Sequence, residues 1–262
     1  MSEYAGRGDP KRTLELLWGL AEKSSRGPKG RLDVAAIVRA AIELADAHGL
    51  PALSMRKVAD KLGAGVMSLY TYVPSKAELL DLMVDAVQEE IERPDPPAGD
   101  WRERMRWFAR QDWHLHRRHP WLLQVAASRP VLGPNLTMKY DHGLTAIDGI
   151  GLSDLEMDAV YTLVESFVRG AAQFAVDAAQ AEQSTGKSDL EWWEEFGPQL
   201  ARVSDGSTFP TASRVGQAAG EVYQAAHSPE HTFEFGLARI LDGVELLIQA
   251  QGRDGQSRNG QC

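Results

Sequence analysis

The chain has 262 residues, of which 43% are hydrophobic and 25% charged, and this globular composition excludes a disordered or low-complexity protein. No apolar run approaches the roughly 18 residues that indicate a membrane span, and the polar residues 1–10 do not resemble a secretory signal. Cys262 is the only cysteine, which excludes an intrachain disulfide and a thiolate metal cluster. We therefore expect a soluble, cytoplasmic protein with no membrane partner.

Charge is unevenly distributed along the chain. The net charge is −9, yet residues 1–76 contain 12 Lys+Arg against 8 Asp+Glu, so the acidic excess lies entirely in the remainder. A basic N-terminal part on an acidic body is the asymmetry expected when one end of a molecule meets phosphate. The charge pattern alone does not decide between a nucleic-acid partner and chance variation of the surface.

Helix signals dominate from Asp33 onwards. Residues 1–31 contain a short apolar patch followed by a basic stretch, residues 23–31, and we expect them to form a flexible basic extension. Asp33 is a typical N-cap, apolar residues then recur at helical spacing, and Gly49 is a stop signal. Ser54 is the expected cap of a second helix, which the glycines at 63 and 65 interrupt.

A third, short helix carries Val66, Leu69 and Val73 on one side and ends before Pro74. Ser75 and Glu78 have the spacing of a capping box and predict a fourth helix running to about Glu92. The proline-rich residues 93–99 then break the pattern. This break is the best boundary between an N-terminal part and the rest of the chain.

Beyond the break, three capping boxes predict helix starts: Asp100 with Glu103, Ser153 with Glu156, and Ser188 with Glu191. A last helix is expected to open near Ser228 and Pro229, and residues 252–262 to form a disordered polar tail. No segment alternates convincingly with the period of a strand. The sequence therefore predicts an all-α fold.

Residues 54–76 are the stretch that most directly suggests a function. Two short helices joined by a glycine turn make a helix-turn-helix unit. Burial of the apolar side of the second helix turns Met67, Ser68, Thr71 and Tyr72 outward, a face suited to the major groove of DNA. Arg56 and Lys76 flank that face, where phosphates would lie. The alternative is an ordinary helix hairpin with surface aromatic residues.

Residues 31–83 resemble the DNA-binding head of the tetracycline repressor (TetR) family, with Leu53 to Ala59, Leu62-Gly63 and Leu69-Tyr70 in register. The resemblance implies a helix-turn-helix domain over 32–76 and a linker helix with a ligand-binding and dimerising body over 77–251. It also implies that Leu69 is a core residue. The residues expected to bind DNA are Ser54, Arg56, Val66, Met67, Ser68, Tyr70, Thr71, Tyr72 and Lys76.

The body is similar to the tetracycline-repressor subgroup through residues 128–130 and 233–237. The resemblance implies a metal-ligating histidine where this chain has Val125. It also implies a drug-facing histidine and a metal-linked glutamate where this chain has Ser166 and Phe174. Valine and phenylalanine cannot bind Mg²⁺. We therefore expect an effector other than a magnesium–tetracycline complex.

The body is rich in aromatic residues, most of which we expect to pack in the core or at an interface. Apolar walls with a few polar groups are nevertheless typical of a small-molecule pocket. The predicted lining is Met105, Phe108, Asp112, Trp121, His142, Glu165 and Arg169. Such a lining favours an apolar, ring-containing effector.

A metal site is an alternative interpretation, suggested by three nearby histidines, His114, His116 and His119. Only His116 and His119 share a helix face, and with two neighbouring arginines a solvated face is favoured. We therefore predict no metal and no cofactor. Common enzyme motifs are absent, so we do not expect an enzyme. The alternatives left open are a DNA-binding dimer that answers to a protein partner or to no effector, and an all-α enzyme.

A homodimer is expected because a short recognition helix reads few base pairs, so a specific operator needs two half-sites. The helix starting near Ser153 and the last helix, near residues 229–250, both carry wide apolar stripes. Together with their symmetry mates they would form a four-helix bundle. We expect Leu241 and Val244 to lie in this interface.

Overall fold

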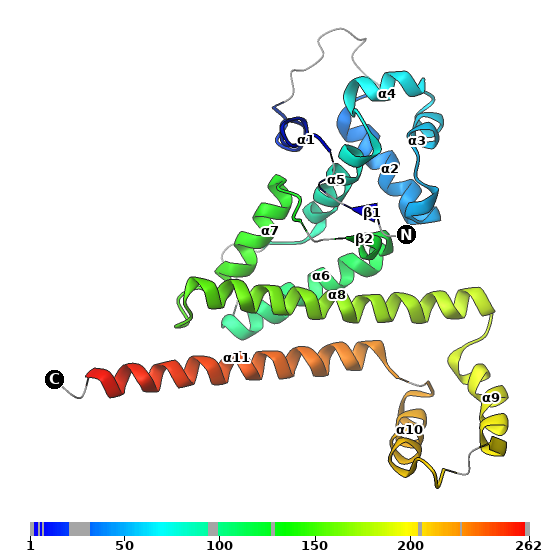
Figure 1. Ribbon diagram of the computed structural model, residues 1–262, viewed down its shortest axis with the longest axis vertical. Coiled ribbons are helices and arrows are strands. Elements are labelled where there is room, and N and C mark those ends of the chain that lie inside the picture. Colours follow the sequence, from blue (N-terminus) through cyan, green and yellow to red (C-terminus); the bar gives the residue numbers. More distant parts are fainter. Residues whose placement is uncertain are drawn as a thin grey trace.

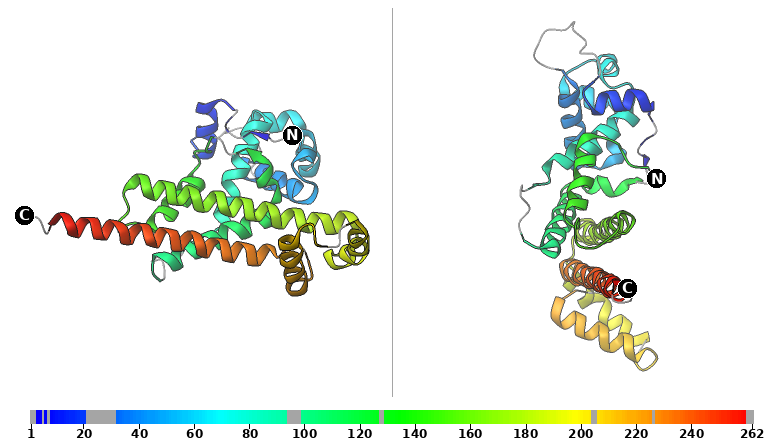
Figure 2. Two further views of the ribbon diagram at one scale, coloured as in Figure 1. Left: turned by 60° about the horizontal axis from the view of Figure 1, so that its bottom comes forward. Right: turned by 90° about the vertical axis from the view of Figure 1, so that its left-hand side faces the viewer.

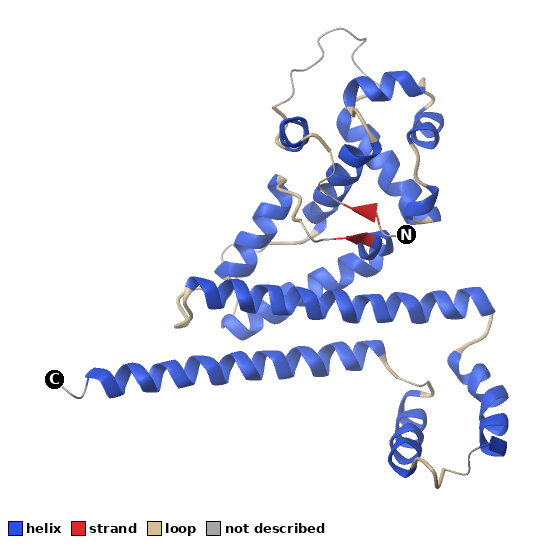
Figure 3. Cartoon of the chain, in the orientation of Figure 1, coloured by secondary structure: helices blue, strands red, loops and turns tan. Residues whose placement is uncertain are grey.

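The computed structural model describes residues 3–4, 6, 8–20, 32–93, 99–126, 129–203, 206–225 and 227–259. This part of the chain is almost entirely helical, with a small N-terminal head above a larger helical body (Figure 1, Figure 3). The predicted all-α fold is confirmed. Within the described ranges, none of the helices combines the length and apolar character needed to cross a membrane.

The head consists of α2 (Val34–His48), α3 (Met55–Leu62) and α4 (Val66–Tyr72), with a 3-10 turn, η1 (Leu50–Ala52), after α2. The Asp33 carboxylate accepts a hydrogen bond from the backbone N–H of Ala36 at 2.7 Å and so caps α2. Gly49 ends the same helix at a φ of 74°, a conformation that favours glycine. Local cap chemistry thus sets both ends of α2, as the sequence predicted.

The linker helix α5 (Lys76–Ala86) is enclosed by the rest of the molecule. Most of its residues are buried, and it packs against α2 in the head and α7 (Pro134–Thr145) in the body. The sequence predicted one helix to about Glu92, but the chain tightens into a 3-10 turn, η2 (Val87–Glu90). The Arg93 guanidinium donates to the Gln88 carbonyl at 2.6 Å and satisfies a group that the helix end leaves unpaired.

The body is built around α6 (Trp101–Arg118), α8 (Asp154–Thr185) and α11 (Pro229–Asn259). The helices α8 and α11 run side by side in opposite directions, and α6 packs across them (Figure 2). Two of the three capping boxes predicted beyond the break, at Asp100 and at Ser153, begin α6 and α8. Between α6 and α7 lie the 3-10 turn η3 (Pro120–Gln124) and the short strand β2 (Val125–Ala126).

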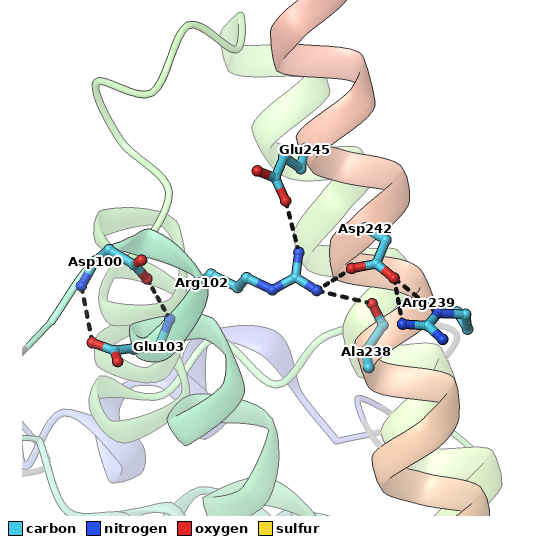
Figure 4. A network of polar contacts seen from close by, with 7 residues as sticks. All are labelled: Asp100, Arg102, Glu103, Ala238, Arg239, Asp242 and Glu245. Carbon is cyan, nitrogen blue, oxygen red and sulfur yellow. Dashed lines mark hydrogen bonds and ion pairs between the residues drawn. The ribbon is translucent and has the colours of Figure 1, made fainter.

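An arginine on α6 ties α6 to α11 (Figure 4). The Arg102 guanidinium donates to Glu245 at 3.1 Å, to the Ala238 carbonyl at 3.3 Å and to Asp242. These contacts lie at the edge of an apolar core that includes Phe108 and Phe233. The polar rim and the apolar core together fix the position of α11 on α6.

Two further helices, α9 (Asp189–Val203) and α10 (Pro210–Tyr223), lie beyond the paired ends of α8 and α11 (Figure 1). Neither helix contains a buried residue. At the exposed surface of α9 the Trp192 ring stacks on that of Phe196 and meets that of Trp193 edge to face. Ser188 and Glu191 form the predicted reciprocal contacts at the start of α9.

The two chain ends differ from the sequence-based expectation. The N-terminal extension contains a strand, β1 (Glu3–Tyr4), that pairs in parallel with β2, and a helix, α1 (Pro10–Leu17). The helix forms because Asp9 caps it and Leu16 and Leu17 are buried. The basic stretch 23–31 lies outside the described residues. At the other end, α11 continues to Asn259, because no proline interrupts a helix that is already propagating.

Candidate DNA-binding and effector sites

The helix-turn-helix unit is formed by α3 and α4. Gly63 ends α3 in the left-handed region with a φ of 63°, and Gly65 stands as the N-cap of α4. Leu69 and Val73 are fully buried in the head core, which confirms the prediction for Leu69. A helix as short as α4 is unstable alone, so these two anchors fix its orientation and leave its opposite face in solvent.

The outward face of α4 contains four of the nine residues predicted to bind DNA. Met67 is 74% exposed and Tyr70 is 41% exposed, and Ser68 and Thr71 are also exposed on α4. Arg56 is exposed on α3, the helix that packs against α4. The Ser54 hydroxyl is engaged in capping α3, where it accepts from the Lys57 N–H at 3.3 Å. The face combines apolar, hydroxyl and cationic groups, as major-groove recognition requires.

Besides Ser54, three of the predicted DNA contacts are less open. Val66 and Tyr72 are partly buried against the head core. Lys76 is partly buried and is the first residue of α5, immediately after the Ser75 cap. Any DNA contact of these residues therefore uses only part of the side chain.

In the body, the structure brings together several predicted effector contacts around a lysine that the sequence analysis missed. Lys139 on α7 is almost completely buried, with its ammonium 2.7 Å from the Asp112 carboxylate on α6. The same ammonium lies 2.6 Å from the Glu165 carboxylate on α8. Met105 and Phe108 are buried in the adjoining apolar core. A buried charged cluster thus joins α6, α7 and α8.

The electrostatics of this cluster favour the charged forms of Asp112 and Lys139. Burial alone would raise the pKa of Asp112, but the Lys139 ammonium brings it below its ordinary value. Burial would lower the pKa of Lys139, yet the two carboxylates raise it above its ordinary value. Burial raises the pKa of Tyr161, and the charge of Glu165 adds to the effect.

The signal for Lys139 was present in the sequence. Lys139 lies one helical turn from Leu136 and from Gly143, which follow the buried side of α7. Gly143 is needed there, since a Cβ atom would stand 2.6 Å from the Tyr161 ring. A lysine on such a face needs a buried partner, which points to Asp112 or Glu165.

Unpaired buried polar atoms mark the edge of the same region. Neither ring nitrogen of His142 has a hydrogen-bond partner within the described part of the chain, and the indole nitrogen of Trp113 has none either. Burial lowers the pKa of His142, and the charge of Arg93 lowers it further, so the ring is neutral at pH 7. The ring of His142 meets that of Trp107 edge to face at 5.9 Å. These nitrogens are groups that a ligand could pair.

Comparison with known proteins gives the same division into head and body. The profile of bacterial regulatory proteins of the tetR family matches residues 37–83, and that of the tetracyclin repressor-like C-terminal domain matches residues 93–248. The chain belongs to the TetR family. It is therefore a DNA-binding transcriptional regulator and not an enzyme.

Three TetR relatives illustrate the similarity. The HTH-type transcriptional repressor DrrR1 of Streptomyces coeruleorubidus is 44% identical over 94% of this chain and 90% of the relative. The class C tetracycline repressor of Escherichia coli is 28% identical over 83% and 92%. The structure of ActR from Streptomyces coelicolor in complex with actinorhodin has a TM-score of 0.67 and 30% identity, covering 81% and 94%.

The TetR-like body also shows what occupies the positions where the subgroup resemblance implied metal ligands. Val125 is buried in β2, and its carbonyl accepts from the Arg169 guanidinium at 2.7 Å. Phe174 is 40% exposed on α8, where its ring lies 4.1 Å from that of His227. Ser166 is exposed on the same helix. Our expectation of a metal-free effector thus stays a prediction for this TetR protein.

Trp121 lies apart from the other predicted effector residues, at the junction between the TetR head and body. Its indole N–H donates to the Asp46 carboxylate of α2 at 2.8 Å. The ring of His119 spans the same junction, with Nδ1 2.7 Å from Asp46 and Nε2 3.0 Å from Glu90. Burial alone would raise the pKa of Glu90, but its contacts with Arg118 and His119 lower that pKa below its ordinary value. These groups fasten the head to the body.

The interpretation of the three histidines as a solvated face is therefore wrong for two of them. His119 is buried at the junction, and His116 is buried with Nδ1 2.9 Å from the Asp112 carbonyl. For His119 the error arose because its carboxylate partners, Asp46 and Glu90, lie on other elements and are distant in the sequence. The partner of His116, Asp112, lies one turn earlier on α6, but spacing alone did not show that this turn is buried.

Proposed function

We propose that the protein is a homodimeric repressor that binds a roughly palindromic operator and leaves it when an aromatic small molecule binds the body. The observation that carries the proposal is that one chain has both an exposed α4 face and a body region with unpaired polar groups. The relative DrrR1 is named a transcriptional repressor, and ActR binds actinorhodin. The linker helix α5 packs against both parts.

DNA recognition is assigned to the exposed face of α4. Met67 and Tyr70 supply apolar and aromatic surface for base edges and thymine methyl groups. Arg56 supplies charge for phosphate. In a dimer, two such faces about 34–36 Å apart would enter successive major grooves.

Met67→Ala is expected to weaken operator binding by about 1 kcal/mol, the lower end of the range for a lost base contact, and to leave random-DNA binding unchanged. Arg56→Ala should weaken both and reduce the salt slope by about 1 because it removes a phosphate contact. Met138→Ala, at an exposed methionine of the body, is the matched control. Gel shifts at several salt concentrations measure these effects. If Met67→Ala lowered the affinity for operator and for random DNA equally, the assignment of base readout to α4 would be wrong.

Effector binding is assigned to the region between α6, α7 and α8. The rings of Trp107, Phe108 and Tyr161 lie in this region, those of Phe108 and Tyr161 buried, and the His142 nitrogens offer polar contacts. An aromatic ligand with oxygen substituents can stack on the rings and hydrogen-bond to His142. A ligand that prefers one head spacing must weaken operator binding as much as the operator weakens the ligand.

Actinorhodin is the probe of choice because the similar protein ActR binds it. We expect it to lower operator affinity by about 5- to 150-fold, the usual range of allosteric coupling, in a fluorescence-anisotropy titration. His142→Phe keeps an aromatic ring without nitrogens and should weaken actinorhodin binding. His48→Phe, at an exposed position in the head, is the control. Tight binding of actinorhodin with unchanged operator affinity would instead favour a dimer that answers to a protein partner or to no effector.

A further inference from the structure

The N-terminal segment is folded across the junction between the linker helix and the body (Figure 1). We use the name N-terminal strap for its described residues between Glu3 and Leu20. The strand β1 pairs with β2 of the body, with Glu3 opposite Val125. The helix α1 packs on α5. The strap thus contacts both parts that must move relative to each other if a ligand is to change DNA binding.

On the linker side, the strap pairs two buried carboxylates of α5. The Gly6 N–H donates to Asp81 at 2.9 Å, and the Asp9 N–H donates to Glu78 at 3.1 Å. Asp81 is only 1% exposed, and a buried carboxylate without donors would be strongly unfavourable. Gly8 allows the close approach, because a Cβ atom there would stand 2.6 Å from the Glu78 carboxylate. The acidic face of α5 is therefore fitted to this backbone.

On the body side, the strap reaches the segment that α8 holds. Arg169 donates to the carbonyls of Leu122 at 3.3 Å, Leu123 at 2.9 Å and Val125 at 2.7 Å. Val125 is in the strand that pairs with β1. Further along the strap, the Trp18 indole donates to the Leu132 carbonyl at 2.9 Å. Hydrogen bonds thus run from Arg169 on α8 through β2 and the strap to Asp81 on α5.

We propose that the N-terminal strap is a coupling device that transmits a change at the effector site to the DNA-binding head. This inference rests on the proposed function, since Arg169 belongs to the predicted effector lining. Parallel pairing of β1 with β2 has a discrete register, so the strap holds α5 in one orientation rather than following the body loosely. Without the strap, the head keeps its fold but turns more freely on the body.

The first test needs no effector. A nitroxide label is attached at Asp60→Cys, an exposed position of the head, in a Cys262→Ser background. Pulsed electron-spin measurements then give the distribution of distances between the two heads of the dimer. Removal of residues 1–20 should broaden this distribution. Equal widths with and without these residues would overturn the proposal.

A matched pair of point variants guards against a folding defect in the shortened chain. Asp81→Leu removes the acceptor for the Gly6 N–H, whereas Asp81→Asn keeps an acceptor oxygen in the same place. Asp81→Leu should broaden the head-to-head distance distribution, and Asp81→Asn should leave it narrow. Identical distributions for the two variants would contradict the role of this joint.

The second test measures coupling. The ratio of operator affinities with and without actinorhodin should fall toward 1 in the protein that lacks residues 1–20, while operator affinity without actinorhodin changes little. An unchanged ratio in the shortened protein overturns the proposal. If the full chain itself shows no response to actinorhodin, the proposed effector response fails for that probe, and the label distances still decide whether the strap restrains the head.

Discussion

Replacing Leu163 with glutamate is expected to convert the proposed dimer into monomers in light scattering at micromolar concentration. Leu163 is 51% exposed and begins an apolar stripe on α8 that continues through Phe167, Gly170 and Phe174. These positions are one to three helical turns apart and share a face. An unpaired charge buried in an interface costs about 3–5 kcal/mol, which is more than a hundredfold in the dissociation constant.

The stripe on α8 adjoins a second stripe on α11, formed by Gly236, Ile240, Gly243 and Leu247. The two stripes meet where Gly236 lies against the Phe167 ring, so close that a Cβ atom would stand 2.5 Å from it. By contrast, Cβ atoms at Gly170 and Gly243 would have nothing within 4 Å. This open, apolar two-helix surface suits a second copy packed about a two-fold axis as a four-helix bundle.

Leu155→Glu is the matched control, because Leu155 is an 83% exposed leucine of α8 that lies outside the stripe. It should remain dimeric. Leu163→Glu should also lose most of its operator affinity, because a single head engages only one half-site. If the Leu163→Glu protein dimerised as tightly as the unmodified chain, the placement of α8 in the interface would be wrong.

This surface was predicted only in part from the sequence. The sequence predicted that α8 and α11 carry apolar stripes, but the prediction placed Leu241 and Val244 in the dimer interface. Both are buried in the core of the single chain, so glutamate there would unfold the body rather than split the dimer. Periodicity reports that a helix has an apolar face. It cannot say which of two adjacent apolar faces packs inside the chain and which meets another copy.

Helix starts were predicted well because their chemistry is local. Asp33, Ser54 and Asp100 each cap a helix by accepting from an N–H three residues ahead. Burial of ionisable groups was not predicted, because their partners are distant in sequence. His119 meets Asp46 across 73 positions, and Lys139 meets Asp112 across 27. The position of Lys139 on the buried side of α7 signals that it needs a partner, but only the fold shows that Asp112 and Glu165 meet it.

The structure separates Trp121 from the other predicted effector residues, again because its partner is distant in the sequence. Asp112, Glu165 and Arg169 are held in one region because α6 and α8 pack closely. Trp121 follows the end of α6 and turns toward α2 instead, where Asp46 pairs its indole N–H. Helical spacing within α6 stops at His119, so it could not carry a prediction across that turn.

Lys139→Met is expected to lower the free energy of unfolding by about 3–5 kcal/mol, because it leaves a buried carboxylate without its cation. Lys139 is 4% exposed and bridges Asp112 and Glu165. Lys187→Met is the control, since Lys187 pairs with Glu195 at the surface and such a pair contributes at most about 1 kcal/mol. Urea denaturation followed by circular dichroism measures both.

The pH dependence of the free energy of unfolding distinguishes the effect of an unpaired charge from a simple loss of packing. In the unmodified protein the pKa of Asp112 is lowered, so its stabilising contribution is lost as pH falls through the folded-state pKa. Without Lys139, burial dominates and raises that pKa above the unfolded value. The deficit of Lys139→Met is then largest above the raised pKa and shrinks as pH falls through it. A deficit that is constant between pH 8 and pH 5 would indicate packing loss alone.

A double variant completes the argument. Adding Asp112→Asn to Lys139→Met removes the charge that the methionine leaves unpaired, while Glu165, which is partly exposed, can remain hydrated. The double variant should therefore be more stable than Lys139→Met by about 0.5–3 kcal/mol, the usual interaction energy of neighbouring residues. If Asp112→Asn instead adds a further loss, the Lys139 ammonium is not what keeps the Asp112 carboxylate charged. The cluster would then owe its stability to His116, 3.7 Å from the same carboxylate, or to Arg169.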